Sequence, residues 1–79
     1  MMEPMDTTDW RNLEQVAAGN VLLDSRSLLD KGRIAGFLKL YEAGYCTLIE
    51  TGPGDSVHIF AISEAGKEAL EARRREQGR

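Results

Sequence analysis

Cysteine, histidine, proline and aromatic residues are all scarce in this chain of 79 residues. It holds one cysteine, one histidine and two prolines, and 6% of its residues are aromatic. A single cysteine excludes an intrachain disulfide, and one cysteine with one histidine falls short of a Cys/His zinc set. We therefore predict no metal site and no cofactor, and we expect Cys46 to be a small buried residue of a strand.

Long apolar runs are also missing. None approaches the roughly 20 residues that span a bilayer, and the N-terminus "MMEPMDTTDW" is acidic where a secretory signal would be positively charged. With 42% hydrophobic and 29% charged residues, the chain has an ordinary globular composition. These features predict a cytoplasmic protein without a membrane partner, built as a disordered tail over residues 1–7 and a single domain over residues 8–79.

The chain lacks an excess of basic residues. Residues 1–23 contain four acidic residues and one arginine, so this segment carries the whole net charge of −3 and the remainder is neutral. Proteins that hold nucleic acid mainly by counterion release usually show a basic excess. Any DNA contact must therefore come from a local patch. There is also no phosphate-binding loop and no Ser/His/Asp set, so we expect the protein not to be an enzyme.

Apolar residues at spacings of three and four predict a first helix over residues 9–19. Thr8 or Asp9 is suited to cap it, and Gly19 to end it in a left-handed conformation. The following "VLL" is either a short strand or the lead into a turn.

A second short helix is expected to start at Asp24 or Ser25 and to turn Leu28 and Leu29 inward. We favour a break near Gly32, because glycine in a helix interior costs about 1 kcal/mol relative to alanine. One long helix over residues 25–43 is the alternative.

A third helix over residues 33–43 is predicted to end at Gly44 in the left-handed conformation. The period then changes to two. "YCTLIET" and "SVHIFAI" read as the strands of a hairpin joined by the turn "GPGD" at residues 52–55. Ser63 is suited to cap a final helix through "EAGKEALEARRREQ", whose thin apolar stripe is Ala65, Ala69, Leu70 and Ala72.

This order of elements resembles a winged helix-turn-helix domain. "IAGFLKLYEAGYC" looks like a recognition helix and its exit into the first wing strand, and "AISEAGKEAL" is similar to the segment with which MarR-type transcriptional regulators leave the wing. The resemblance covers about residues 32–72. It implies an α+β fold with three N-terminal helices, a β-hairpin wing and a C-terminal helix; another small α+β domain built around the same hairpin is the alternative.

The resemblance also implies that the third helix enters the DNA major groove. The residues in and before this helix that offer donors or a hydroxyl for double-stranded DNA are Arg26, Ser27, Lys31, Arg33 and Lys39. The wing tip carries acidic Asp55 and no arginine, which departs from the basic wing usual in the family.

Helical angles predict two separate strips on the third helix. The core stripe is Ile34, Phe37, Leu38 and Tyr41, and the outward strip contains Gly32, Gly36, Leu40 and Ala43. Small residues four apart let another backbone approach, so the outward strip is predicted to be a packing interface. Its partner is either the chain's own first or last helix, or a second copy.

Two functions follow from these observations. The first is a small winged-helix DNA-binding transcriptional regulator that acts as a dimer. The second is a winged-helix protein-protein interaction module that does not bind DNA.

Overall fold

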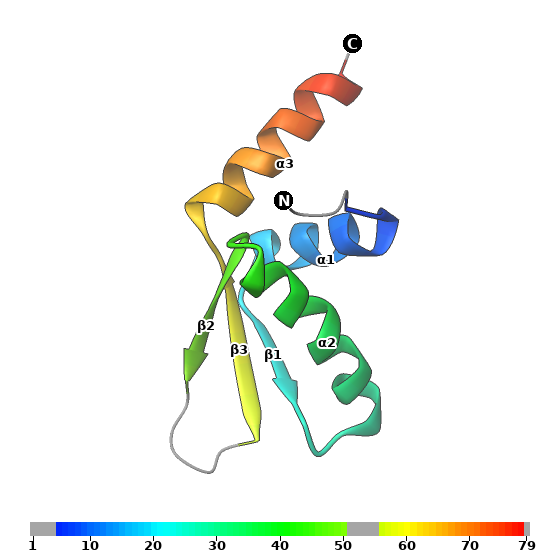
Figure 1. The fold of residues 1–79 in the computed structure, drawn as a ribbon, viewed down its shortest axis with the longest axis vertical. Helices are drawn as coiled ribbons and strands as arrows, with labels where there is room; N and C mark the ends of the chain where they lie inside the picture. Colours follow the sequence, from blue (N-terminus) through cyan, green and yellow to red (C-terminus); the bar gives the residue numbers. More distant parts are fainter. Residues whose placement is uncertain (1–4, 51–55, 79) are drawn as a thin grey trace.

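The computed structural model describes residues 5–50 and 56–78. Within these residues the chain forms three helices and three strands (Figure 1), which confirms the predicted α+β class. In chain order they are α1 (Thr7–Ala18), β1 (Val21–Asp24), α2 (Leu28–Glu42), β2 (Cys46–Glu50), β3 (Val57–Ile62) and α3 (Glu64–Gln77). The strands form one antiparallel sheet in the order β1-β3-β2.

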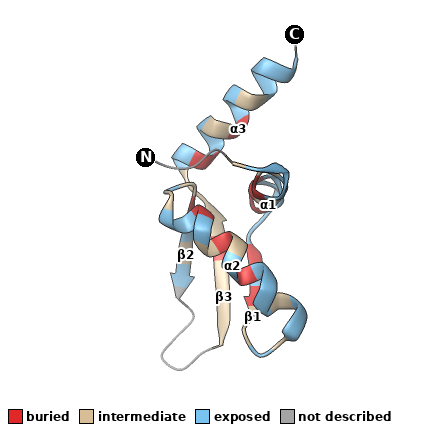
Figure 2. Ribbon diagram, turned by 45° about the vertical axis from the view of Figure 1, so that its right-hand side comes forward, coloured by how far each residue is buried: buried red, intermediate tan, exposed pale blue. Residues whose placement is uncertain are grey.

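The core lies between one face of the sheet and the helices α1 and α2. Phe60 of β3 is fully buried there, opposite Val21 of β1 and Leu48 of β2. Its ring stacks on that of Phe37 from α2, with the two centroids 5.4 Å apart. Figure 2 shows in red that both helices carry buried residues. Helices α1 and α2 both pack on this face, so neither of them covers the opposite face of the sheet.

Helix α1 begins earlier than the sequence predicts. Asp6 is its N-cap and forms a capping box with Asp9: the Asp9 N–H donates to Oδ1 of Asp6 over 2.8 Å, and the Asp6 N–H donates to Oδ2 of Asp9 over 3.2 Å. Met5 packs against the core. The predicted tail is therefore wrong for residues 5–7, while residues 1–4 lie outside the described part. Gly19 has a φ of 169°, which is extended rather than left-handed.

A single helix, α2, replaces the two helices predicted before the hairpin. Ser27 is its N-cap, not Asp24 or Ser25, and the helix runs through Gly32 without a break. The cost of one helical glycine, about 1 kcal/mol, is smaller than the gain from burying several large side chains of one continuous helix. The prediction of three N-terminal helices is thus wrong, and "VLL" lies in strand β1.

The end of α2 confirms the predicted role of Gly44. Its φ of 88° is left-handed, its N–H donates to Tyr41 O over 3.0 Å, and the N–H of Tyr45 donates to Leu40 O over 2.9 Å. These two bonds make a Schellman motif, which satisfies carbonyl groups that the helix end would otherwise leave free. The predicted turn at residues 52–55 lies outside the described residues.

Helix α3 is capped by Ser63 as predicted, and it packs on the body through its N-terminal half. Ser63 Oγ accepts from the N–H of Gly66 over 3.1 Å and donates to Gly44 O over 2.6 Å. Gly66 and Leu70 are buried, whereas the predicted stripe residues Ala65 and Ala72 are exposed. The C-terminal half extends away from the sheet (Figure 1), along a molecule 46 Å in its longest dimension.

Candidate functional site

The buried side of α2 differs from the predicted stripe. Ile34, Phe37 and Leu40 are buried, and Tyr41 is 44% exposed. The prediction that Leu40 faces outward is therefore wrong, since only 1% of it is exposed. The apolar residues of α2 lie on several sides of the helix, so their periodicity does not define one buried side. The buried side is set by the sheet and α1, which contact α2 from two directions.

The small residues of the predicted outward strip have different environments. A Cβ at Gly36 would lie 2.8 Å from Nδ2 of Asn12 in α1, whereas a Cβ at Gly32 would meet nothing within 4 Å. Ala43, the C-cap of α2, is half-buried. The close approach at Gly36 is thus made by the chain's own first helix, which was one of the two predicted partners.

Lys39, a predicted DNA contact, is bonded to a buried carboxylate. Its Nζ lies 2.8 Å from Oδ2 of Asp9, whose side chain is only 6% exposed. The hydrogen bond from Lys39 lowers the pKa of Asp9, burial raises it, and the hydrogen bond donated by the backbone N–H of Asp6 lowers it further. Because this pair ties α2 to the N-terminus of α1, a phosphate would have to compete with Asp9 for Lys39.

Arg26 and Ser27 form the connection between β1 and α2. Two Arg26 nitrogens, Nε and Nη2, approach the two oxygens of Asp24 at 3.3 and 3.1 Å, and the Arg26 N–H donates to Oδ1 over 2.9 Å. The Arg26 side-chain bond, followed by the backbone N–H bond, lowers the pKa of Asp24 to about 2. The Ser27 hydroxyl accepts from the N–H of Asp30 as the helix cap. Both predicted DNA residues thus have a local structural role.

Arg33 and Lys31 lie on exposed parts of α2. Nη2 of Arg33 donates to Oε1 of Gln15 in α1 over 2.9 Å. Of the five predicted DNA residues, the structure groups Arg26, Ser27 and Lys31 near the start of α2 and places Arg33 and Lys39 beside α1. Carboxylates bond to two of the four cations, so these residues do not form a concentrated positive patch.

The face of the sheet away from α1 and α2 carries an aliphatic row that crosses all three strands. Leu22 of β1 and Ile49 of β2 both pair with Ile59 of β3. Leu22 is 61% exposed, Ile49 is 43% exposed and Ile59 is half-buried. We call these three residues the aliphatic row. Sequence reasoning missed it, because alternation places residues on two faces but does not say which face the helices cover.

A second exposed apolar feature stands at the start of α2. Leu28 and Leu29 are 89% and 85% exposed, which makes the prediction that they turn inward wrong. In the predicted short helix they would have packed on the body. In the continuous helix they occupy the first turn, beyond the reach of the core.

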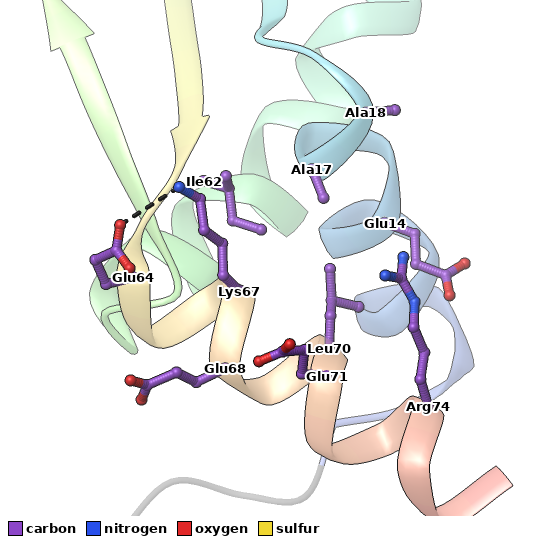
Figure 3. A pocket seen from close by; sticks show the side chains of 10 residues that line it. All are labelled: Glu14, Ala17, Ala18, Ile62, Glu64, Lys67, Glu68, Leu70, Glu71 and Arg74. Atoms are coloured by element: carbon purple, nitrogen blue, oxygen red, sulfur yellow. Dashed lines mark hydrogen bonds and ion pairs between the residues drawn. The ribbon is translucent and has the colours of Figure 1, made fainter. Parts of the chain in front are cut away.

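A groove of about 600 Å³ runs between α1 and α3 (Figure 3). Ala17, Ala18, Ile62 and Leu70 line its apolar part, and charged side chains surround them: Glu14, Glu64, Lys67, Glu68, Glu71 and Arg74. Beside it, the guanidinium carbon of Arg73 lies 4.7 Å from the centroid of the Trp10 ring. The groove thus joins an apolar floor to a charged rim, a combination suited to another polypeptide segment.

The side chains of Cys46 and His58 each lie against a different backbone carbonyl oxygen. Cys46 is 2% exposed and its thiol points to Phe37 O at 3.5 Å, which confirms the expected buried strand residue. Burial raises the pKa of the thiol to about 11. Nδ1 of His58 lies 3.1 Å from Ser56 O, and the ring stacks on Phe60.

Over residues 5–50 and 56–78, no group of three or more histidine, cysteine or acidic side chains is arranged to hold a metal ion. Within the same residues, no helix combines the length and apolar character that crossing a membrane requires.

Comparison with known proteins adds no relative to this description. No protein-family model, curated protein or solved structure matches the chain.

Proposed function

We propose that the protein is a small winged-helix-like module that binds another protein through the open face of its sheet. The role is one of binding rather than enzymatic catalysis. The observation that carries the proposal is the aliphatic row, Leu22, Ile59 and Ile49. Directly opposed side chains on neighbouring strands have Cβ atoms about 5 Å apart, so the row is one contiguous apolar surface.

The contiguity of the row across three strands, rather than the exposure of its members, sets it apart from single exposed aliphatic residues. Single exposed aliphatic residues are common on soluble proteins, whereas contiguous apolar patches mark interaction sites. Leu22 and Ile49 are the two ends of the row and are 61% and 43% exposed. A partner that covers the row gains roughly 25 cal/mol for each Å² of apolar surface removed from water.

DNA binding as a winged-helix transcriptional regulator in the cytoplasm, acting as a dimer, is the second candidate. Two observations favour it: α2 directly precedes the β2–β3 hairpin, and Lys31 and Arg33 are exposed on that helix. Against it stand the bonds from Arg26 to Asp24 and from Lys39 to Asp9. These ion pairs must break before Arg26 and Lys39 can bind phosphates and so release counterions from DNA.

The protein-binding proposal is tested by affinity capture. Three proteins are immobilised, and the proteins that each retains from an extract of the source cells are compared. They are the wild type, the double variant Leu22→Lys/Ile49→Lys, and Leu28→Lys as a control at a more exposed leucine away from the sheet. A protein retained by the wild type is then purified, and its affinity is measured by calorimetry. We expect the double variant to bind at least about 30-fold more weakly, as for a hot-spot loss of about 2 kcal/mol. The control should bind like the wild type.

The same proteins are titrated with mixed duplex DNA at about 50 mM and 200 mM salt. Equal affinity of the double variant and the wild type for the purified partner would overturn the sheet-face proposal. If the wild type retains no protein but binds DNA in a salt-dependent way that Arg33→Glu abolishes, the DNA-binding candidate replaces it.

A further inference from the structure

Strand β2 lies at one edge of the sheet. The strand order β1-β3-β2 leaves its outer side unpaired among the described residues (Figure 1). Natural proteins usually protect such an edge with lysine, proline or a β-bulge. The sequence of β2, "CTLIE", contains neither lysine nor proline, and β2 pairs with β3 residue by residue without a bulge. The edge of β2 can therefore accept another strand.

The pairing of β2 with β3 shows which backbone groups face this edge. The N–H of Ser63 donates to Tyr45 O over 3.2 Å, so these two residues form a hydrogen-bonded pair in the register of the two strands. Hydrogen-bonded and non-hydrogen-bonded pairs alternate along an antiparallel ladder. Thr47 and Ile49 therefore bond to β3, whereas the N–H and C=O of Leu48 point away from β3 toward the open edge.

The opposite edge of the sheet, on β1, is obstructed. The Ser25 N–H donates to Ser56 O over 2.9 Å, which by the same alternation makes Asp24 an outward-facing residue of β1. The N–H of Asp24 already donates to Oδ2 of Asp30 over 3.1 Å. In the part of the chain that the structure describes, no equivalent bond closes the edge of β2 at Leu48. The β1–α2 connection thus blocks one edge, and the β2 edge is left open.

The surroundings of the open edge favour an extended, aliphatic and basic segment. On the open face of the sheet, β2 carries Thr47 and Ile49, and Ile49 is one end of the aliphatic row. A residue opposite Ile49 on an added strand has its Cβ about 5 Å away, so an aliphatic residue there continues the row. Residues 40–57 contain three acidic residues and no lysine or arginine, which favours basic residues in the partner.

We propose that the partner binds the sheet with an extended segment that pairs with the open edge of β2 as a fourth strand. Alternate residues of this segment are aliphatic and lie beside Thr47 and Ile49, and lysine or arginine flanks them. Main-chain hydrogen bonds to Leu48 supply affinity and the side chains beside Ile49 supply specificity, while the rest of the partner covers the aliphatic row. The inference rests on the proposed sheet-face function, since it names the binding segment of that partner.

Synthetic peptides test strand addition directly. The probe alternates threonine and valine and has a lysine at each end. Two matched versions carry N-methyl groups, one on every threonine and the other on every valine. Because successive amides of a strand point to opposite edges, a strand that pairs with β2 tolerates N-methylation of one set and not of the other. A block version has the same composition, with the threonines and the valines grouped separately.

Hydrogen exchange of the isotope-labelled protein, followed by NMR, is the measurement. In the free protein we expect fast exchange at the amide of Leu48 and slow exchange at those of Thr47 and Ile49, which bond to β3. Saturation with the probe should slow exchange at Leu48 at least about tenfold. Only one N-methylated version should keep this effect, and the block version should lose it. A probe with glutamate at both ends should bind at least about threefold more weakly at about 50 mM salt.

The proposal is overturned if the probe leaves exchange at Leu48 unchanged up to about 1 mM, or if the two N-methylated versions act alike. Slow exchange at Leu48 that depends on protein concentration without the probe also overturns it, because a second copy then occupies the edge. Equal binding of the block version or of the glutamate version has the same consequence.

The variant Leu22→Lys separates strand addition from the sheet-face function. Leu22 lies on β1, across the sheet from the open edge, so the variant should bind the probe like the wild type while its affinity for the purified partner falls. If its affinity for the partner is unchanged but the probe still slows exchange at Leu48, the sheet-face function is contradicted and strand addition is supported. Loss of probe binding in this variant would contradict pairing at the β2 edge.

Discussion

The junction between α3 and the turn after α2 depends on the absence of a side chain at Gly66. A Cβ placed there would fall on the backbone carbonyl oxygen of Tyr45, well inside van der Waals contact, and 2.9 Å from Cγ1 of Ile62. The carbonyl belongs to the backbone and has no flexible end that could move aside. Replacement by alanine therefore requires α3 to shift as a unit relative to Tyr45.

Such a shift would strain the bonds that attach α3 to the body. The N–H of Ser63 donates to Tyr45 O over 3.2 Å, and the Ser63 hydroxyl donates to Gly44 O over 2.6 Å. Overpacking costs about 1–3 kcal/mol, and each weakened hydrogen bond costs up to about 1 kcal/mol. The better helix propensity of alanine returns at most about 1 kcal/mol. We expect Gly66→Ala to lower the free energy of unfolding by about 1–3 kcal/mol.

Gly32→Ala is the matched control, because it makes the same chemical change inside a helix. A Cβ at Gly32 meets nothing within 4 Å, so only the propensity term acts, and we expect a gain of up to about 1 kcal/mol. Urea unfolding followed by circular dichroism measures both variants. In a domain of this size, 1 kcal/mol corresponds to roughly 4–8 °C in the melting temperature. A Gly66→Ala protein as stable as Gly32→Ala would refute the reasoning.

Two further predictions follow from the titratable groups. Lys39→Met removes the partner of the buried Asp9 carboxylate, and we expect a loss of about 1–3 kcal/mol at neutral pH. Because the folded-state pKa of Asp9 is lowered, its contribution to stability is present above about pH 4 and is lost as the pH falls through the folded-state value. Urea unfolding from pH 7 to pH 2 should therefore show a shallower acid loss in Lys39→Met, and an unchanged slope would contradict the assignment. Burial raises the pKa of Cys46 to about 11, so at pH 8 a thiol reagent should label the folded protein far more slowly than the urea-unfolded one; equal rates would show that the thiol is accessible.

Local sequence signals determined the elements whose ends depend on neighbouring residues. Gly44 predicted the end of α2, and Ser63 predicted the start of α3, because a left-handed glycine and a hydroxyl cap act within one turn of the chain. Alternation likewise predicted the hairpin strands, and the lack of any disulfide or metal-site partner predicted a buried Cys46. Local signals also misled: Thr8 and Asp9 are good caps, yet Asp6 accepts the capping bond from Asp9.

Tertiary structure alone decided the surfaces. Whether Leu40 or Tyr41 faces the core depends on where α1 lies, since both are apolar and neighbour each other on α2. The continuity of α2 through Gly32 depends on burial elsewhere along the helix, which outweighs a local cost of about 1 kcal/mol. The sequence does not show that Lys39 and Arg26 are paired with carboxylates. The position of α1 brings Asp9 to Lys39, and the β1–α2 connection brings Asp24 to Arg26. The aliphatic row exists because three strands bring one residue each into register while the helices pack on the other face; no single strand contains it.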